Sequence, residues 1–237
     1  MKKIVILVLA AVLMLGLVAC TQPANTNDPD AELNKKSEGV MTYAEYMAAA
    51  VDAEVVIEAY VQGNQSWWDN KITLYLQDLD GGYFAYEVAC SETDAAKLTK
   101  GTKVKISGVK GDWKGEIEVM NGTIEILEGT WVAEATDVTA YLGTDELIKH
   151  QNKFVTIKDL TIAAITYKNG EPGDDIYVDF TKDGKTYSFC VERYLTGPET
   201  DVYKAFATLQ VGDVVDIEGF LYWYDAANTH ITAVVKK

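Results

Sequence analysis

Two stretches of this 237-residue chain share one pattern: LTKGTKVKISG at residues 98–108 and LQVGDVVDIEG at residues 209–219. Leucine, glycine, valine, isoleucine and glycine recur at the same relative positions in both. Apolar and polar residues alternate, which is typical of a β-strand with one buried face. A pattern that recurs after about a hundred residues indicates two copies of one structural unit in tandem.

The repeated pattern also predicts how its strand is used. Val104 and Ile106 face the interior of the first unit, and Lys103, Lys105 and Ser107 face outward. Gly101 permits the turn into the strand, and Gly108 permits a bend or bulge where a small barrel turns a corner. The equivalent residues of the second unit are Gly212, Val215, Ile217 and Gly219.

Both halves of the chain show the same order of predicted elements around this strand. A short helix comes first, with a capping box of Thr42 and Glu45 in the first half and an N-cap at Thr144 in the second. A first strand, a hairpin with an Asp-Gly turn, a helix-prone link, the repeated strand and a final strand follow. The helix is predicted at residues 42–51 and 144–151, the first strand at 54–62 and 153–162, and the hairpin at 72–89 and 176–191. The link is predicted at residues 91–100 and 192–210, and the segment that closes each half at 115–127 and 225–237.

Five short antiparallel strands with a helix-prone link between the third and fourth match the OB-fold, a small Greek-key barrel. We therefore predict an all-β fold with short helices, built from two tandem OB-fold-like five-stranded barrels. The first covers residues 41–128 and the second residues 139–237. Each has the size of an ordinary domain.

The first twenty residues, MKKIVILVLAAVLMLGLVAC, predict the compartment. Two lysines precede an apolar run that is shorter than the roughly 20 residues of a membrane-spanning helix, which indicates a signal peptide at residues 1–19. Residues 17–20 resemble the lipobox of bacterial lipoprotein precursors. That resemblance implies diacylglycerol transfer to Cys20, acylation with chains such as palmitate, and an anchor on the extracytoplasmic face of the cell membrane. The alternative is a plain secreted protein in which Cys20 is incidental.

Residues 20–40 are polar and are predicted to be a flexible tether, because they cannot bury enough apolar surface to fold. The chain carries 36 acidic and 21 basic side chains, a net charge of −15. Removal of residues 1–19 takes away two lysines and no acid, which leaves 36 against 19 and a net charge of −17. This charge disfavours a nucleic-acid partner, because phosphate backbones repel it.

The stretches VVIEAYVQG, ITLYLQDLDGGYFAYEV and LTKGTKVKISGVKGDWKGEIEV together resemble the extracytoplasmic OB-fold domains of bacterial lipoproteins. The same type of domain accompanies secreted nuclease and phosphodiesterase modules. The residues that follow the family's pattern before the third strand are Leu76, Gln77, Asp78, Gly81 and Gly82. The resemblance covers residues 41–127 and, more weakly, 139–237, where Asp179 and Phe180 replace Gln-Asp. It implies a binding or accessory module without catalytic residues of its own.

Few residues suit catalysis or metal binding. The chain has two histidines, His150 and His230, and one arginine, Arg193, and no common catalytic or zinc-binding motif joins them. We predict no enzymatic activity, no cofactor and no metal site. The acidic turns at residues 78–82 and 173–177 offer oxygen ligands to Ca²⁺, but solvated turn carboxylates are the favoured interpretation.

The aromatic residues give the candidate binding site. The 14 tyrosines and 5 tryptophans exceed the 6 phenylalanines, as at recognition surfaces. Strand parity places Tyr75 outward on the second strand; on the third it places Phe84, Tyr86 and Val88 inward and Tyr83 outward. The outer face of these strands usually binds the ligand in OB-folds. The candidate ligand-binding residues are Tyr75, Tyr83, Trp67, Trp68, Gln77 and Tyr177. Alternatively, these tyrosines pack against the neighbouring barrel or the capping helix.

These features predict a non-catalytic, membrane-anchored binding or accessory module of the cell envelope, with a glycan, peptide or protein as its partner. The alternative is an OB-fold protein that binds single-stranded nucleic acid, as an accessory to an extracellular nuclease. Stacking on aromatic rings suits this alternative, and the net charge opposes it.

Overall fold

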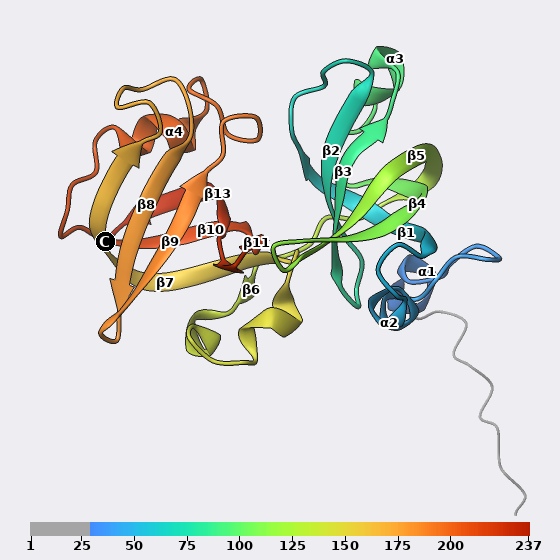
Figure 1. The fold of residues 1–237 in the computed structure, drawn as a ribbon, viewed down its shortest axis with the longest axis horizontal. Coiled ribbons are helices and arrows are strands. Elements are labelled where there is room, and N and C mark those ends of the chain that lie inside the picture. The colour runs from blue at the N-terminus through green and yellow to red at the C-terminus, as the bar shows by residue number, and fades with distance from the viewer. Residues whose placement is uncertain (1–28) are drawn as a thin grey trace, which may run out of the picture.

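The computed structural model describes residues 29–237, so the predicted signal peptide and Cys20 lie outside the described residues (Figure 1). The helices are α1 (Pro29–Leu33), α2 (Tyr43–Ala48), α3 (Glu92–Ala95) and α4 (Asp201–Phe206), with 3₁₀ turns η1 (Thr139–Tyr141) and η2 (Leu147–His150). The strands are β1 (Glu54–Asn64), β2 (Lys71–Gln77), β3 (Gly82–Ala89), β4 (Thr102–Trp113), β5 (Glu116–Thr130), β6 (Thr136–Asp137), β7 (Phe154–Tyr167), β8 (Ile176–Lys182), β9 (Lys185–Val191), β10 (Val214–Phe220), β11 (Trp223–Tyr224), β12 (Ala226–Ala227) and β13 (His230–Lys236).

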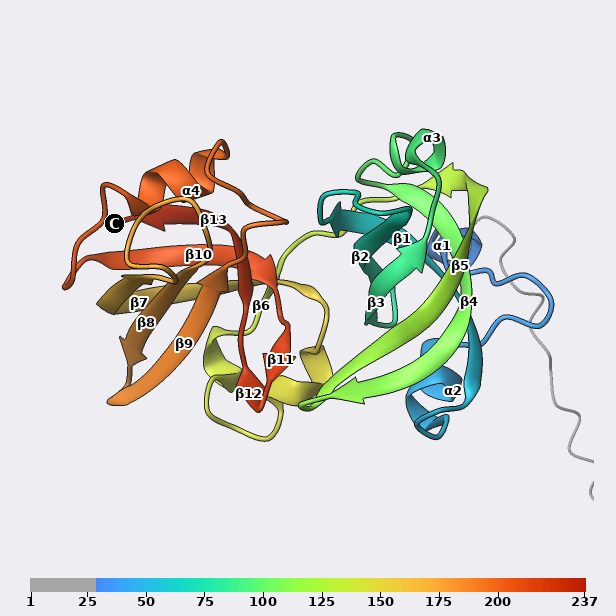
Figure 2. The same cartoon turned by 45° about the horizontal axis from the view of Figure 1, so that its top comes forward.

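Strands β1 to β5 form a closed barrel in the order β1-β2-β3-β5-β4 (Figure 2). The pairing of β3 with β5 is parallel, and β1 closes the barrel against β4. Ile57, Leu74 and Ile106 fill the interior and are fully buried. Helix α3 follows β3, where the helix-prone link is predicted. The OB-like barrel predicted for the first half is therefore confirmed.

The glycines of the repeated pattern have the roles that the sequence predicts. Gly101 and Gly212 have φ angles of +96° and +93°, which favour glycine at these turns. Gly108 lies at a register shift between β4 and β5, and Gly219 lies at one between β10 and β13. A Cβ atom at Gly108 would stand 2.6 Å from the carbonyl oxygen of Met120, so this bulge has room only for glycine.

The C-terminal half, residues 131–237, is built on a six-stranded sheet in the order β10-β13-β9-β8-β7-β6, in which β10 also pairs with β7. Strands β9 and β13 meet in a parallel pairing at Cys190 and His230. Phe180, Phe189 and Ile217 belong to its core. The prediction of an all-β fold with short helices is confirmed. Of the two predicted barrels, the structure shows the first, formed by β1 to β5.

The two predicted initial helices differ in outcome. Helix α2 begins after Thr42, and the capping box is present: the side chain of Thr42 accepts from the backbone of Glu45, and the Glu45 carboxylate accepts from the backbone of Thr42. The helix predicted from Thr144 is only the 3₁₀ turn η2, which begins at Leu147. No side chain caps the start of η2, whereas Thr42 caps the start of α2.

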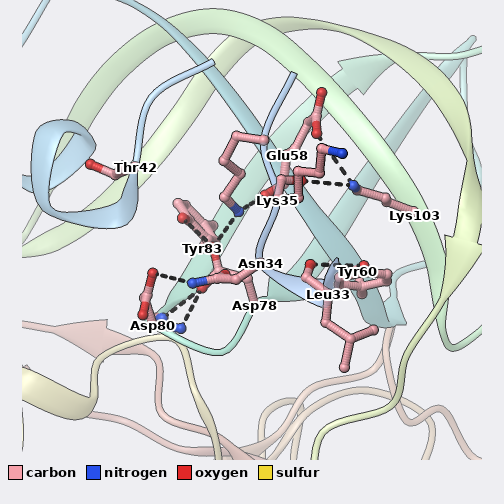
Figure 3. Close-up of polar contacts among 12 residues, drawn as sticks. Leu33, Asn34, Lys35, Thr42, Glu58, Tyr60, Asp78, Asp80, Tyr83 and Lys103 are labelled. Carbon is pink, nitrogen blue, oxygen red and sulfur yellow. Dashed lines mark hydrogen bonds and ion pairs between the residues drawn. The ribbon is translucent and has the colours of Figure 1, made fainter. Parts of the chain in front are cut away.

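Residues 33–41, here called the strap, lie against the barrel, which differs from the flexible tether predicted over residues 20–40. Asn34 donates to Asp80 at 2.6 Å, and Tyr60 donates to the carbonyl oxygen of Leu33 at 3.0 Å (Figure 3). The ammonium group of Lys36 lies 2.7 Å from the buried carboxylate of Asp78. A buried carboxylate needs a cationic partner, and the strap supplies it.

Cys90 and Cys190 are both free and buried, so no disulfide joins the two halves. Within residues 29–237, no helix combines the length and apolar character needed to cross a bilayer.

Candidate ligand-binding groove

The C-terminal half covers much of the predicted binding face of the barrel. The contact between the two halves, here called the seam, has an aromatic cluster of Tyr75 and Phe84 from the barrel and Phe220 from β10. The rings of Tyr75 and Phe220 stack with centroids 4.5 Å apart and planes 17° apart. The hydroxyl of Tyr75 lies 2.6 Å from Nδ1 of His230. Tyr75 is 1% exposed and presents no free ring face to a ligand.

Tyr83 faces the barrel interior, so its predicted outward orientation is wrong. Its ring contacts Tyr43 and Tyr46 of helix α2, with centroids 5.3 and 5.2 Å away, and its hydroxyl donates to Asp78 at 2.7 Å. Burial and the Asp78 carboxylate raise the pKa of Tyr83. The alternative interpretation, that these tyrosines pack within the protein, therefore describes both: Tyr75 packs on the neighbouring half and Tyr83 on helix α2.

The wrong orientation predicted for Tyr83 has a local cause in β3. Glu87 has a φ angle of +46°, and the pairing of β2 with β3 shifts register near this point. The irregularity breaks the two-residue alternation, so Val88 points inward while Tyr86 and Phe84 point outward. Counting back from Val88 by twos therefore places Tyr83 on the wrong face.

Gln77 is also buried in the seam, at 7% exposure. Its Oε1 atom accepts a hydrogen bond from the backbone of Phe154 at 2.7 Å. Two barrel glycines allow this close approach: a Cβ atom at Gly63 would stand 2.8 Å from the Phe220 ring, and one at Gly82 would stand 2.2 Å from the backbone of Asn152. The seam is thus closely packed, and the part of the face around Tyr75 and Gln77 is closed to a ligand.

The open part of the face is a groove of about 850 Å³ at one edge of the seam. One wall is the loop between β1 and β2 with the start of β2, and the floor includes Tyr86 and Glu87 of β3. The opposite wall is the segment of residues 192–198 from the C-terminal half. The loop between the first two strands is a usual ligand contact in OB-folds.

Aromatic rings dominate the exposed surface of the groove. Trp68 is 80% exposed, Tyr194 is 56% exposed and Tyr86 is 44% exposed. Trp67 is half-buried, and its indole N–H donates to the carbonyl oxygen of Cys90 at 2.9 Å, which anchors the loop. The carbonyl oxygen of Tyr194 accepts from the backbone of Ser66 at 2.9 Å and ties the two walls together. Both predicted tryptophans therefore line the groove. Trp67 anchors the loop, and Trp68 exposes its ring to solvent.

The charged groups of the groove nearly balance. Lys71 and Glu87 form an ion pair at 2.7 Å, which raises the pKa of the lysine and lowers that of the glutamate. Burial raises the pKa of Glu192, whose carboxylate accepts from the backbone of Leu195 at 2.8 Å.

Two further groups in the groove walls lack such partners. Arg193 and Asp69 make no side-chain hydrogen bond or ion pair with residues 29–237, and the guanidinium carbon lies 5.6 Å from the centroid of the Tyr194 ring. Both groups are exposed and can hydrogen-bond to a ligand.

The remaining candidate residues lie elsewhere. Tyr177, on β8, is 41% exposed and does not line the groove; its hydroxyl donates to Asp175 at 3.4 Å. The acidic turns considered for Ca²⁺ are occupied by protein groups, since Lys36 bonds to Asp78 and Lys168 bonds to Asp175 at 2.9 Å. Within residues 29–237, no three His, Cys, Asp or Glu side chains are grouped to hold a metal ion.

Sequence reasoning missed Tyr86, Arg193 and Tyr194. Strand parity places Tyr86 inward because it ignores the irregularity at Glu87. Arg193 and Tyr194 belong to the link after β9, far from the barrel in sequence. The signal available in the sequence was that the chain's single arginine is next to a tyrosine.

No family model and no curated protein matches this chain. Among solved structures, it is similar to the Ifi202 HINa domain in complex with 20-bp dsDNA, at 10% identity, covering 78% of this chain and 98% of that one, with a TM-score of 0.35. A murine DNA-binding protein bound with dsDNA is 13% identical over 77% of this chain and 96% of that one, with a TM-score of 0.37. Replication protein A bound to ssDNA is 13% identical over 84% of this chain and 52% of that one, with a TM-score of 0.31. At such identities, what these proteins bind does not transfer to this chain.

Proposed function

We propose that this chain is a non-catalytic binding module that takes a glycan into the groove at the edge of the seam. The observation that carries the proposal is the set of three exposed rings, Trp68, Tyr86 and Tyr194, around one groove. Such rings are amphipathic platforms, on whose faces the apolar side of a sugar ring packs. OB-folds bind oligosaccharides at this face and at this loop.

The free charges of the groove support a sugar ligand. Asp69 and Arg193 both line the groove, and neither side chain makes a hydrogen bond to another side chain within residues 29–237. A carboxylate accepts two hydrogen bonds and a guanidinium donates several in a fixed plane, so the two groups complement neighbouring hydroxyls. Hydroxyl groups carry no charge, and the acidic surface of the chain does not repel them.

Single-stranded nucleic acid is the second candidate, because the same exposed rings can stack on bases and OB-folds bind oligonucleotides at this face. Arg193 would then meet a phosphate. The carboxylates of Asp69, Glu87 and Glu192 in the same groove oppose this ligand, and the net charge of −15 weakens long-range attraction.

Affinity measurements at two salt concentrations separate the candidates. The wild-type chain and a Trp68→Ala/Tyr194→Ala variant are titrated with a panel of neutral and acidic oligosaccharides and with oligothymidylate. We expect oligosaccharide binding that changes little with salt and falls about tenfold or more in the variant. Tyr141→Ala, which removes an exposed ring outside the groove and the seam, is the control and should bind as the wild type does.

Oligothymidylate binding that weakens steeply with salt would instead establish the nucleic-acid candidate. Binding of either probe that the double variant retains in full would refute the groove as the site.

We also propose that the C-terminal half is a second OB-like barrel and that residues 41–128 and 139–237 are the two structural units. Strands β7, β8, β9, β13 and β10 pair in a cycle that corresponds, strand by strand, to β1, β2, β3, β5 and β4. The two cycles also share a parallel pairing between the third and the last strand. The second is looser, because that pairing has a single register pair.

The lipid anchor is part of the proposal and rests on residues 17–20 of the sequence. Cys20→Ser removes the thiol that would accept the diacylglycerol, so the variant should accumulate as an unprocessed precursor and take up no labelled fatty acid. Equal labelling of the variant and the wild type would contradict a lipoprotein and leave the plain secreted protein.

A further inference from the structure

The tip of the β4–β5 hairpin, residues 113–116, docks on the C-terminal half at a point of the seam away from the groove. The backbone of Asp225 donates to the carbonyl oxygen of Lys114 at 2.7 Å, and the side chain of Gln151 donates to the carbonyl oxygen of Gly115 at 2.8 Å. A Cβ atom at Gly115 would stand 2.9 Å from the Trp223 ring. The hairpin tip therefore lies directly against the other half.

Glu116 completes this contact with a fully buried carboxyl group. Its Oε2 atom accepts from the backbone of Trp223 at 2.8 Å and from the side chain of Gln151 at 3.2 Å, and both donors belong to the C-terminal half. Its Oε1 atom is buried and has no hydrogen-bond partner in the described chain. Glu118, two residues further on β5, is 6% exposed. Within residues 29–237, no cation forms an ion pair with either carboxyl group.

Hydrogen-bond donors surround Glu116, but within residues 29–237 none of them carries a positive charge. The groups around it are the hydroxyls of Tyr43, Tyr46 and Tyr222, the carboxyl of Glu118 with Asp112 beside it, and the amides of Gln151 and Asn152. The nearby cation Lys114 pairs with Asp225 at 3.5 Å. Protonation of Glu116 removes a buried charge that no cation of the described chain pairs with.

We propose that Glu116 is a proton-binding site that controls the docking of the two halves, and that its neutral carboxyl holds the seam closed while its ionised form loosens it. The proposal goes beyond the binding of a ligand and does not depend on which ligand the groove takes.

The direction of the pH dependence follows from the change in environment. Burial raises the pKa of Glu116 from 4.5 to about 8 and that of Glu118 to about 7. When the halves separate, Glu116 meets water and its pKa returns toward 4.5. Between these values the docked form holds one more proton, so the ratio of docked to separated molecules falls about tenfold for each unit of rising pH. The ratio is constant well below pH 4.5 and again above the raised pKa.

The test follows the docked population of the full chain from pH 5 to pH 9 by the distance between two spin labels at the exposed positions of Lys97 and Lys185, one in each half. Glu116→Gln keeps an acceptor for the backbone of Trp223 but cannot ionise. We expect the docked fraction of the wild type to fall with rising pH and that of the variant to stay high. Glu125→Gln, an exposed position on the same strand, is the matched control and should follow the wild type.

Identical pH profiles of the wild type and Glu116→Gln would overturn the proposal. If that variant fails to fold, the NMR titration of the Glu116 side-chain carboxyl in the wild type decides instead. A titration above pH 7 supports the proton site, and a titration near the ordinary value of a glutamate while the halves remain docked refutes it.

Discussion

Single tyrosines show how burial divides residues that look alike in the sequence. Tyr75 is buried in the seam, Tyr83 is buried under helix α2, and Tyr86 lies in the groove at 44% exposure. All three occur within twelve residues of the same hairpin. Only the third can touch a ligand without a rearrangement of the protein, so substitutions at these positions should separate stability from binding.

Tyr83→Ala is expected to lower the free energy of unfolding by about 3–5 kcal/mol, because it empties a fully buried aromatic site. It also leaves Asp78 without the hydroxyl that donates to it at 2.7 Å. Tyr86→Ala should change stability by no more than about 0.5 kcal/mol but weaken ligand binding. Chemical denaturation measures the first effect. Similar losses of stability in both variants would contradict the assignment of Tyr83 to the core and Tyr86 to the surface.

The strap brings a cation to a buried carboxylate of the barrel. It places Lys36 between the carbonyl oxygen of Glu58 at 2.6 Å and the carboxylate of Asp78 at 2.7 Å. Glu58 and Asp78 are 0% and 1% exposed, and Lys103 approaches Glu58 at 3.4 Å. The strap thus neutralises the buried carboxylate of Asp78, while Lys103 of β4 pairs with that of Glu58.

Lys36→Met keeps most of the apolar stem and removes the charge. We expect a loss of about 3–5 kcal/mol in the free energy of unfolding, the usual cost of breaking a largely buried pair from one side. Lys97→Met, which breaks an exposed pair with Asp94, is the control and should cost no more than about 1 kcal/mol. Equal effects of the two substitutions, measured by urea unfolding, would show that the strap contact is a surface pair.

The elements also show what a sequence can predict. The strands, the Asp-Gly hairpins and the glycines of the repeated pattern follow from local periodicity and turn chemistry, and these predictions agree with the structure. The orientation of Tyr83 does not follow, because the irregularity at Glu87 interrupts the alternation without a glycine to mark it. The docking of the strap depends on Glu58 and Asp78, two acids whose burial no local pattern reveals.

At the scale of the whole molecule, the seam decides which surface remains free. It removes Tyr75 and Gln77 from the predicted site and leaves Trp67 and Trp68 at its edge. The groove joins residues 65–73 to residues 192–198, which lie more than a hundred positions apart. Such a junction depends on how two folded units pack, and patterns within each unit carry no information about it.

An NMR titration of the full chain with the tightest-binding oligosaccharide tests the central claim, that the groove at the edge of the seam is the binding site. We predict that the indole N–H of Trp68 and the backbone amides of Ser66 and Tyr194 show the largest shifts, because they lie on the two walls of the groove. Shifts that gather around Tyr177 on β8, with the groove signals unchanged, would contradict the claim.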